Sequence, residues 1–242
     1  MIPLNEEQLQ RLRGNVLVLT GAGISVASGI SPFRGDGGLY EGLNPYELAS
    51  PEAFARQPVT VWNWYLMRIS QGKDSTPNAG HFAIARLSQL STKLTLVTSN
   101  VDELHEEAGS PLVYHLHGKV REFRCTRCHE VVLVDPSGLP QQVDETNMPK
   151  CICGGLQRPN VVWFGEFPSS EAIMAAENGL DTADLLLEVG VSGSVSYGIT
   201  EAALRMGIPT LMINPDPRPI HGATLCRESA EVVLPRILEM LD

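Results

Sequence analysis

The feature that most constrains this 242-residue chain is an apolar run that ends in a glycine turn. Residues 16–20 (VLVLT) are typical of a buried parallel strand, and residues 21–25 (GAGIS) follow them directly. A glycine turn between a strand and a helix lets backbone N–H groups approach a phosphate, and the helix N-terminus adds partial positive charge. The segment therefore favours an α/β fold that binds a dinucleotide.

The glycine pattern differs from the fingerprint of common dinucleotide-dependent dehydrogenases. Gly21 and Gly23 fit its first two positions, but Val26 stands where the third glycine is expected. No acidic residue follows about 20 residues later, where such enzymes hold the ribose hydroxyls. Taken alone, the segment is equally compatible with an ordinary glycine turn, so other parts of the chain must decide.

Further apolar runs, separated by segments of helical periodicity, predict a doubly wound parallel sheet. The predicted strands are 94–98, 161–163, 184–191 and 210–214, and the predicted helices are 77–88, 170–177, 196–206 and 232–241. Polar residues follow three strands, at 98–102, 190–194 and 214–216. Because open α/β sheets bind ligands at the carboxyl ends of their strands, we expect these groups to line one crevice.

The composition is typical of a soluble enzyme. Hydrophobic residues make up 43% of the chain, charged residues 19%, and the formal net charge is −10. An acidic chain repels phosphate backbones, so nucleic-acid binding is not expected. No apolar run approaches the roughly 20 residues of a membrane span, and residues 1–7 lack the features of a signal peptide. We therefore expect a cytoplasmic protein that binds no membrane.

Four of the five cysteines form two close pairs, Cys125 with Cys128 and Cys151 with Cys153. Two thiolate pairs on tight turns are a ligand set for tetrahedral zinc, and four thiolates leave no position for a catalytic water. Disulfides are disfavoured in a reducing compartment, and a redox C-x-x-C pair normally opens a helix. We therefore predict one structural Zn²⁺ ion that holds the insert between the pairs together.

Six motifs, in a fixed order along the chain, resemble those of the sirtuin family of NAD-dependent protein-lysine deacylases. Residues 21–25 resemble its opening motif, and residues 29–35 its cofactor-binding loop. The other four matches are 98–105 (TSNVDELH) to T-Q-N-I-D-x-L-H, 116–118 (LHG) to the catalytic-histidine motif, the cysteines to the zinc module, and 158–166 (RPNVVWFGE) to the substrate-pairing strand. The resemblance extends from about residue 19 to about residue 234.

The resemblance implies a Rossmann-like NAD-binding domain with a smaller lobe. Residues 1–35, 73–118 and 159–242 are expected to form the larger domain. The smaller lobe is expected to combine a helical insert, residues 36–72, with the zinc module, residues 119–158.

The resemblance also implies a reaction in which no hydride moves. The acyl oxygen of a modified lysine attacks the ribose carbon of NAD as nicotinamide leaves, and the products include free lysine and O-acyl-ADP-ribose. His117 is the expected general base on a ribose hydroxyl, a role that suits an imidazole because its pKa lies near the working pH. Without the family motif, His117 would not stand out, since His115 has the same parity on the strand.

The resemblance assigns the NAD contacts to four segments of the chain. These residues are Gly21, Ala22, Gly23, Ile24, Ser25, Ile30, Phe33, Arg34, Ser99, Asn100, Val101, Asp102, Gly190, Ser192 and Asn214. Asn100 and Asp102 are expected in the nicotinamide pocket, and Arg34 on a loop that closes over NAD. Ser99 and Val191 depart from the glutamine and threonine usual in the family, which affects the expected NAD affinity rather than the reaction type.

The same resemblance predicts a site for acidic acyl groups. Tyr65 and Arg68 match the Y-x-x-R pattern of sirtuins that prefer succinyl and malonyl groups, since a phenol and a guanidinium can clamp a carboxylate. Ala49 matches a position where a small side chain widens the acyl channel. Strand addition of the acyl-lysine peptide is expected at Val162, Phe164 and Gly165. From spacing alone, Tyr65 and Arg68 are instead a packing pair on one helix face.

The expected function is removal of succinyl, malonyl and also acetyl groups from lysines of proteins or peptides by a monomeric enzyme. Two alternatives stay open. Mono-ADP-ribosyl transfer to a protein side chain would need no carboxylate clamp. A non-catalytic module that senses NAD or ADP-ribose would not need Asn100, Asp102 and His117 together.

Overall fold

The computed structural model describes residues 4–32, 38, 42–192 and 196–241. Its largest element is a six-stranded parallel sheet with the order β3–β2–β1–β7–β8–β9. The strands are β1 (Asn15–Thr20), β2 (Lys93–Thr98), β3 (Val113–His115), β7 (Leu185–Val189), β8 (Thr210–Ile213) and β9 (Thr224–Cys226). The strand order reverses between β1 and β7, which is where open α/β sheets bind their ligands.

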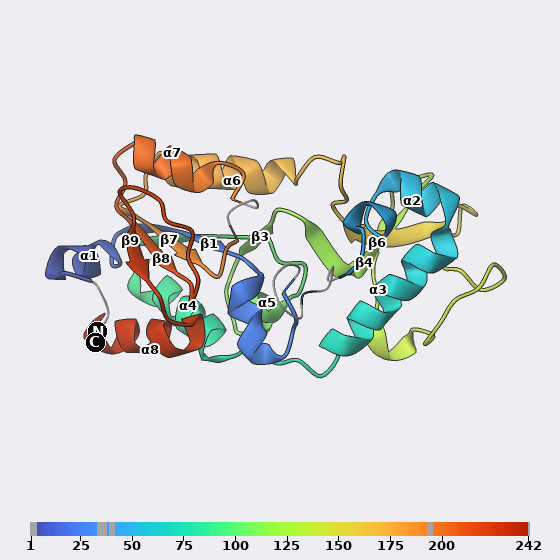
Figure 1. The fold of residues 1–242 in the computed structure, drawn as a ribbon, viewed down its shortest axis with the longest axis horizontal. Coiled ribbons are helices and arrows are strands. Elements are labelled where there is room, and N and C mark those ends of the chain that lie inside the picture. The colour runs from blue at the N-terminus through green and yellow to red at the C-terminus, as the bar shows by residue number, and fades with distance from the viewer. Residues whose placement is uncertain (1–3, 33–37, 39–41, 193–195, 242) are drawn as a thin grey trace.

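Helices cover both faces of this sheet, with α1, α4 and α8 on one face and α6 and α7 on the other (Figure 1). Their bounds are α1 (Glu6–Arg11), α4 (Ala79–Leu90), α6 (Ser170–Leu180), α7 (Ile199–Arg205) and α8 (Ala230–Leu241). Strand β1 shows the reason: Val16 and Val18 pack into the core under α4 and α8, whereas Leu17 and Leu19 pack under α6 and α7. Side chains alternate along a strand, so a continuous apolar run buries both faces.

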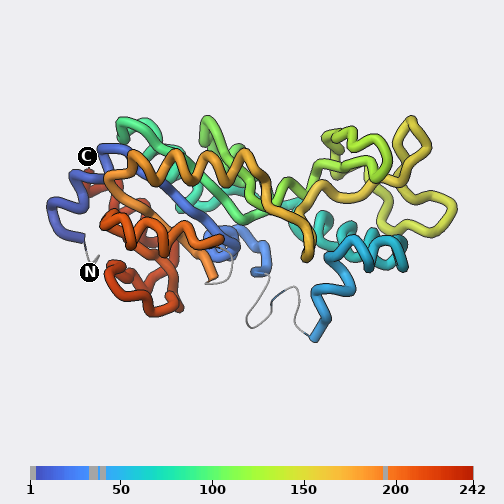
Figure 2. The backbone as a smooth tube through the Cα atoms, turned by 90° about the horizontal axis from the view of Figure 1, so that it is seen from above, coloured from blue at the N-terminus to red at the C-terminus, as the bar shows by residue number. Residues whose placement is uncertain are grey.

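A second, three-stranded antiparallel sheet lies at the other end of the molecule (Figures 1 and 2). It has the order β5–β4–β6, formed by β4 (Gly118–Cys125), β5 (Val131–Leu133) and β6 (Gln157–Val161). Helices α2 (Pro51–Arg56) and α3 (Pro58–Gly72) pack on it through a cluster that contains Trp62, Tyr65, Phe123 and Trp163. The remaining short helices are η1 (Ala22–Ser28), η2 (Pro45–Glu47), α5 (Leu104–Glu107) and η3 (Pro136–Gly138).

The predicted doubly wound sheet is confirmed, with β2, β7 and β8 at three of the four further predicted strands. The fourth prediction, a parallel strand at 161–163, is wrong. Val161 ends β6 of the antiparallel sheet, and Trp163 packs against the aromatic residues of α2 and α3. Val161 and Trp163 are buried in the aromatic cluster of the small sheet, whereas Val162 between them is only partly buried. The expected boundary between residues 158 and 159 also falls inside β6.

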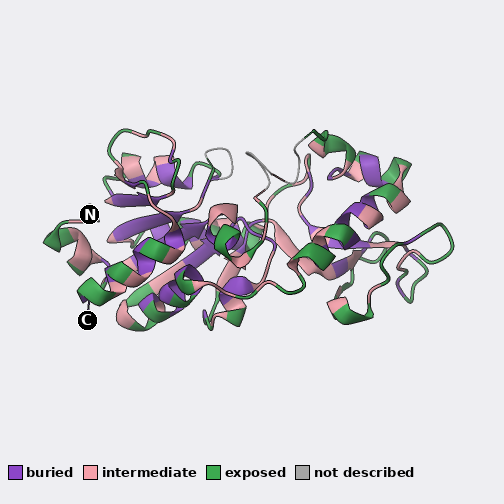
Figure 3. Ribbon diagram, turned by 60° about the horizontal axis from the view of Figure 1, so that its bottom comes forward, coloured by how far each residue is buried: buried purple, intermediate pink, exposed green. Residues whose placement is uncertain are grey.

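Most strands of the main sheet are buried over much of their length (Figure 3). Four of the buried polar residues lie together at the ends of β1 and β2. Thr20, Thr98, Ser99 and Asn100 are all less than 9% exposed. Buried polar groups need hydrogen-bond partners, so apolar packing alone does not explain this cluster. Within the described residues, no helix is long and apolar enough to span a membrane.

Candidate active site

The glycine turn after β1 lies directly against the end of β7. The Gly23 N–H donates to the Gly190 carbonyl oxygen at 2.9 Å, and a Cβ on Gly23 would lie 2.7 Å from the Gly190 Cα. Only glycine permits this approach of two backbones. The predicted helix after the turn is the seven-residue 3₁₀ helix η1, which ends at Gly29 with φ of 86°. The turn thus closes one side of a crevice at the β1–β7 switch point.

Asn100 is held from several sides by neighbouring groups. Its Nδ2 donates to the Gly21 carbonyl and to Ser25 Oγ, both at 3.2 Å, and its backbone N–H donates to Thr98 Oγ1 at 3.1 Å. Its backbone oxygen accepts from His115 Nδ1 at 3.1 Å. Among the described residues, its buried Oδ1 has no partner. A buried acceptor held this rigidly is suited to receive an N–H from a ligand.

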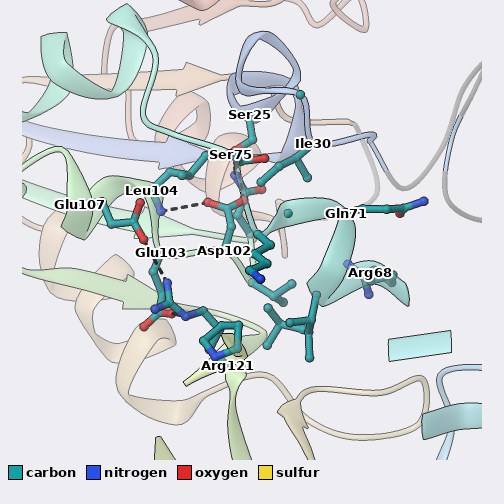
Figure 4. Close-up of a pocket in the computed structure, with 18 of the residues that line it drawn as sticks. Ser25, Ile30, Arg68, Gln71, Ser75, Asp102, Glu103, Leu104, Glu107 and Arg121 are labelled. Carbon is teal, nitrogen blue, oxygen red and sulfur yellow. Dashed lines mark hydrogen bonds and ion pairs between the residues drawn. The ribbon is translucent and has the colours of Figure 1, made fainter. Parts of the chain in front are cut away.

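Asp102 lies beside Asn100 and faces a cavity of about 520 Å³ (Figure 4). Its carboxylate accepts from Ser25 Oγ at 3.1 Å and from the Leu104 N–H at 3.3 Å. Burial raises the pKa of Asp102, although these two hydrogen bonds oppose the shift. Arg121 and Glu103, an ion pair at 3.2 Å, line the same cavity. We call this space the Asp102 cavity.

His117 lies at the junction of the two sheets, after β3 and before β4. Its Nδ1 is 2.6 Å from the Ser99 carbonyl oxygen. A carbonyl only accepts, so Nδ1 carries the proton and Nε2 presents its lone pair. Burial lowers the pKa of His117, and the bond to Ser99 only partly opposes this. The ring is therefore neutral near pH 7 and able to accept a proton at Nε2.

The backbone at position 118 requires a glycine after the histidine. Gly118 has φ of 70°, and a Cβ there would overlap the carbonyl oxygen of Asn160 in β6. The chain turns at this residue from the parallel sheet into the antiparallel one, and the His117 carbonyl accepts the Val162 N–H at 2.8 Å. This close approach fixes the imidazole between the two sheets.

A larger cavity of about 920 Å³, here called the main cavity, brings most of the predicted site residues together. They are Ala22, Gly23, Ala49, Tyr65, Arg68, Ser99, Asn100, Val101, His117, Val162, Phe164, Gly165, Gly190, Ser192 and Asn214. The Asp102 cavity adds Ser25, Ile30 and Asp102, and the two cavities share Ala22, Arg68, Asn100 and Val101. Gly21 and Ile24 line neither cavity, and Phe33 and Arg34 lie outside the described residues.

Two of the predicted backbone contacts are already used within the protein. Val162 donates its N–H to His117, and Phe164 donates its N–H to the Ala49 carbonyl at 2.8 Å. Likewise, Asn214 Nδ2 donates to the Val191 carbonyl at 3.1 Å, which ties the ends of β7 and β8 together. Ligands at these positions must therefore use the remaining backbone groups or lone pairs.

Tyr65 and Arg68 face the main cavity from one side of α3. The Arg68 guanidinium lies over the rings of Trp64 and Tyr65, at 4.7 and 5.5 Å from their centroids. Tyr65 is 2% exposed, and Arg68 is partly exposed in the cavity wall. The pair thus lines the same cavity as His117 instead of lying on an outer helix face.

Comparison with known proteins decides the family. A model of the Sir2 family matches residues 21–197. The chain belongs to the Sir2 family. An NAD-dependent protein deacylase of Mycobacterium tuberculosis is 43% identical to it over 231 residues, covering 93% of this chain and 97% of the relative. The sirtuin resemblance of the six motifs is thereby confirmed.

Solved Sir2 structures share the fold over nearly the whole chain. A Sir2 homologue in complex with NAD is 36% identical, with a TM-score of 0.84, and the match covers 98% of this chain and 94% of that one. A Sir2 protein in complex with a p53 peptide and NAD⁺ is 29% identical, with a TM-score of 0.80, and the match covers 97% of both chains.

The four cysteines meet as predicted for the Sir2 zinc module. Their sulfur atoms all lie within 4.8 Å of one another. The Cys125–Cys153 and Cys128–Cys151 sulfur pairs are 3.5 and 3.6 Å apart. Tetrahedral Zn²⁺ with bonds of about 2.3 Å places its sulfurs about 3.8 Å apart, so the cluster fits one structural ion. The N–H groups of Arg127 and Cys128 point at Cys125 Sγ, which favours its thiolate.

Sequence reasoning missed two contacts around His117 and His115. Tyr197 has φ of 48°, and its hydroxyl lies 2.7 Å from His117 Nε2, so it donates to the lone pair of the imidazole. His115, which the sequence could not separate from His117, differs in its second contact: its Nε2 lies 2.9 Å from Glu106 Oε1. No motif marks either contact, since Tyr197 lies 80 positions from His117, and Glu106 lies on helix α5, nine positions from His115.

Proposed function

We infer that this chain is an NAD-dependent protein-lysine deacylase, and we propose that it prefers succinyl and malonyl groups to acetyl groups. The observation that carries the proposal is that Tyr65 and Arg68 line the same cavity as His117. This cavity therefore offers both a neutral base and a cation beside a phenol. An acyl group with a terminal carboxylate fits between them.

His117 is the proposed general base. Its Nδ1 proton is held by the Ser99 carbonyl, so proton transfer occurs at Nε2. In the described structure the Tyr197 hydroxyl occupies that lone pair. A substrate hydroxyl must take the place of the tyrosine hydroxyl before His117 can accept its proton.

The residues proposed to hold NAD lie around the glycine turn. Asn100 and Asp102 would hold the nicotinamide, because a rigid amide oxygen and a carboxylate face the space beside Ala22 and Ile30. Gly190, Ser192 and Asn214, at the far side of the main cavity, would hold the ribose and phosphates. When bound, NAD supplies an electrophilic ribose carbon with nicotinamide as its leaving group.

The acyl site is proposed to recognise charge. A guanidinium pairs with a carboxylate through two parallel hydrogen bonds, and the phenol of Tyr65 can donate a third. An acetyl group carries no terminal carboxylate, so it offers the Arg68 guanidinium no negative charge to pair with. The small side chain of Ala49, which is 3% exposed, leaves the acyl channel wide.

Mass spectrometry of a single set of reactions tests the proposal. The protein is incubated with NAD and with peptides that carry acetyl, malonyl or succinyl lysine. We expect O-acyl-ADP-ribose from all three, with the highest kcat/KM for the acidic acyl groups. ADP-ribose attached to protein would instead indicate mono-ADP-ribosyl transfer, and NAD binding without any product would indicate a sensing module. Equal kcat/KM values for acetyl and succinyl peptides would refute the acidic-acyl preference.

We further propose the division into an NAD-binding domain and a smaller lobe, with the active site where they meet. Location in the cytoplasm and a monomeric state are also proposals. The four clustered thiols support the cytoplasmic location, because a reducing compartment keeps them available for zinc. Light scattering after size-exclusion chromatography tests the second.

A further inference from the structure

Trp163 contacts the proposed carboxylate clamp directly. Its indole Nε1 donates to the hydroxyl oxygen of Tyr65 at 2.8 Å, and both residues are 2% exposed. The sequence singled out Tyr65 and Arg68 for the clamp but gave no role to Trp163, which lies 98 positions away in the chain. The hydrogen bond joins helix α3 to the segment that follows β6.

The direction of this hydrogen bond has a consequence for the Tyr65 hydroxyl. An indole nitrogen only donates, so the Tyr65 oxygen must be the acceptor. Because a phenol O–H prefers to lie in the ring plane, its hydrogen then points away from the indole. Tyr65, Trp163 and Arg68 all line the main cavity. The indole therefore selects the O–H orientation that faces away from itself.

The indole is itself held firmly by a buried ion pair. The Arg158 guanidinium lies 3.2 Å from the centre of the Trp163 ring. Arg158 pairs with both oxygens of Glu166, at 2.6 and 2.9 Å. Glu166 also accepts the backbone N–H of Trp163 at 2.8 Å. The ring plane and the backbone are thus both fixed, and Phe54 packs on the indole at 5.3 Å between centroids.

We propose that Trp163 is a positioning residue that sets acyl specificity: its indole N–H orients the Tyr65 hydroxyl to donate to a carboxylate held at Arg68. This inference rests on the acidic-acyl preference proposed above. Trp163 needs no contact with the carboxylate itself. Because the indole N–H occupies the Tyr65 oxygen from one side, the Tyr65 hydroxyl hydrogen is left to donate to the carboxylate of an acidic acyl group.

Steady-state kinetics of a Trp163→Phe variant test this role, because phenylalanine keeps the aromatic packing and removes the donor. We expect kcat/KM for a succinyl peptide to fall about fivefold to tenfold, the effect of one lost hydrogen bond, mainly through KM. The value for an acetyl peptide should stay within about twofold, as expected for an acyl group without the carboxylate acceptor. Equal losses on both peptides would mean that Trp163 only supports the fold, and no loss on either would overturn the proposal.

A double-mutant cycle with Tyr65→Phe sharpens the test. If the indole acts through the Tyr65 hydroxyl, adding Trp163→Phe to Tyr65→Phe should cause no further loss of succinyl selectivity. Additive losses of selectivity would show that Trp163 acts by another route. Should Trp163→Phe fold poorly, benzothienylalanine at position 163 preserves the shape of indole and removes only the N–H.

Trp62→Phe is a matched control. Trp62 belongs to the same aromatic cluster, is 0% exposed and donates its indole N–H to the Gln157 carbonyl at 2.9 Å. It does not line the main cavity. Its substitution should lower stability without changing the ratio of succinyl to acetyl activity. A wild-type protein without succinyl preference would refute the proposed function, whereas wild-type preference lost in Tyr65→Phe but kept in Trp163→Phe would refute only this inference.

Discussion

The two sheets of this molecule are held together in different ways. The parallel sheet is buried on both faces, between two clusters of aliphatic side chains. The antiparallel sheet has one aromatic cluster, and its edge strand β5 is open to solvent, with Val131 at 46% and Leu133 at 72% exposure. Beyond that cluster, the four cysteines gather at one end of the small sheet.

This difference matters because the proposed site takes residues from the regions of both sheets. His117, Asn100 and Asp102 follow strands of the parallel sheet, where backbone hydrogen bonds fix them. Tyr65 and Arg68 come from the helix that packs on the antiparallel sheet. Under the proposed function, the reaction chemistry belongs to the parallel sheet, and the choice of acyl group to the part of the molecule that carries the cysteine cluster. The following predictions test this division, from the largest expected effect to the smallest.

Substitution of the base should abolish turnover and leave both sheets intact. We expect His117→Ala to lower kcat by about 10²–10⁴-fold, the usual contribution of a general base. The thermal midpoint should change little, since His117 is only partly buried. His129→Asn, at an exposed histidine with φ of 62°, is the control and should retain full activity. Residual activity of His117→Ala above one-tenth of wild type would contradict the assignment.

Loss of the metal should unfold the small sheet before the large one. We expect a zinc chelator, or Cys151→Ser, to remove several kcal/mol of stability from the antiparallel sheet, because structural zinc contributes directly to folding. Hydrogen exchange read by mass spectrometry should show faster exchange in β4, β5 and β6, with β1, β2 and β7 still protected. Cys226→Ala is the control, since this buried thiol lies in β9 of the parallel sheet. Unchanged protection of β4 after zinc removal would refute the structural role of the metal.

Removal of the guanidinium should change selectivity more than catalysis. Arg68→Met keeps the aliphatic stem and removes the charge, so we expect kcat/KM for the succinyl peptide to fall about 10- to 100-fold, the effect of a lost charged hydrogen bond. The acetyl peptide should be affected far less. Arg56→Met, at an exposed arginine of α2, is the control. A parallel loss for both peptides would show that Arg68 supports the fold or NAD binding instead.

Mild acid should destabilise the parallel half through two buried histidines. Burial lowers the pKa of His81 to about 4 and that of His105 to about 3, whereas in the unfolded chain both are near 6.5. Below pH 6.5 the unfolded state therefore binds protons that the folded state does not bind. The free energy of unfolding thus falls as pH decreases toward 4. Between pH 7 and pH 5 we expect a loss of about 2 kcal/mol for each histidine in urea unfolding.

His81→Gln tests the origin of that loss. It removes one titrating group, so the slope of stability against pH should fall by about half. An unchanged slope would show that other groups cause the acid sensitivity.

The sequence predicted the elements whose signal is local. The apolar runs of β1, β2, β7 and β8 predicted the parallel sheet because a strand buried on both faces has no polar alternation. The cysteine spacing predicted the metal cluster because thiolate pairs on tight turns have few other uses. The run at 161–163 misled the prediction, since three apolar residues leave the same pattern whether they form a parallel strand or end an antiparallel one.

The sequence by itself therefore determined the main sheet, the cysteine cluster and, through its motifs, the proposed base and the residues beside it. Only the tertiary structure decided which groups work together across the two halves. The contacts from Trp163 to Tyr65 and from Tyr197 to His117 join positions 98 and 80 residues apart. The physical reason is that periodicity and turn chemistry act between near neighbours in the chain, whereas the direction of a hydrogen bond depends on which distant segments packing brings together.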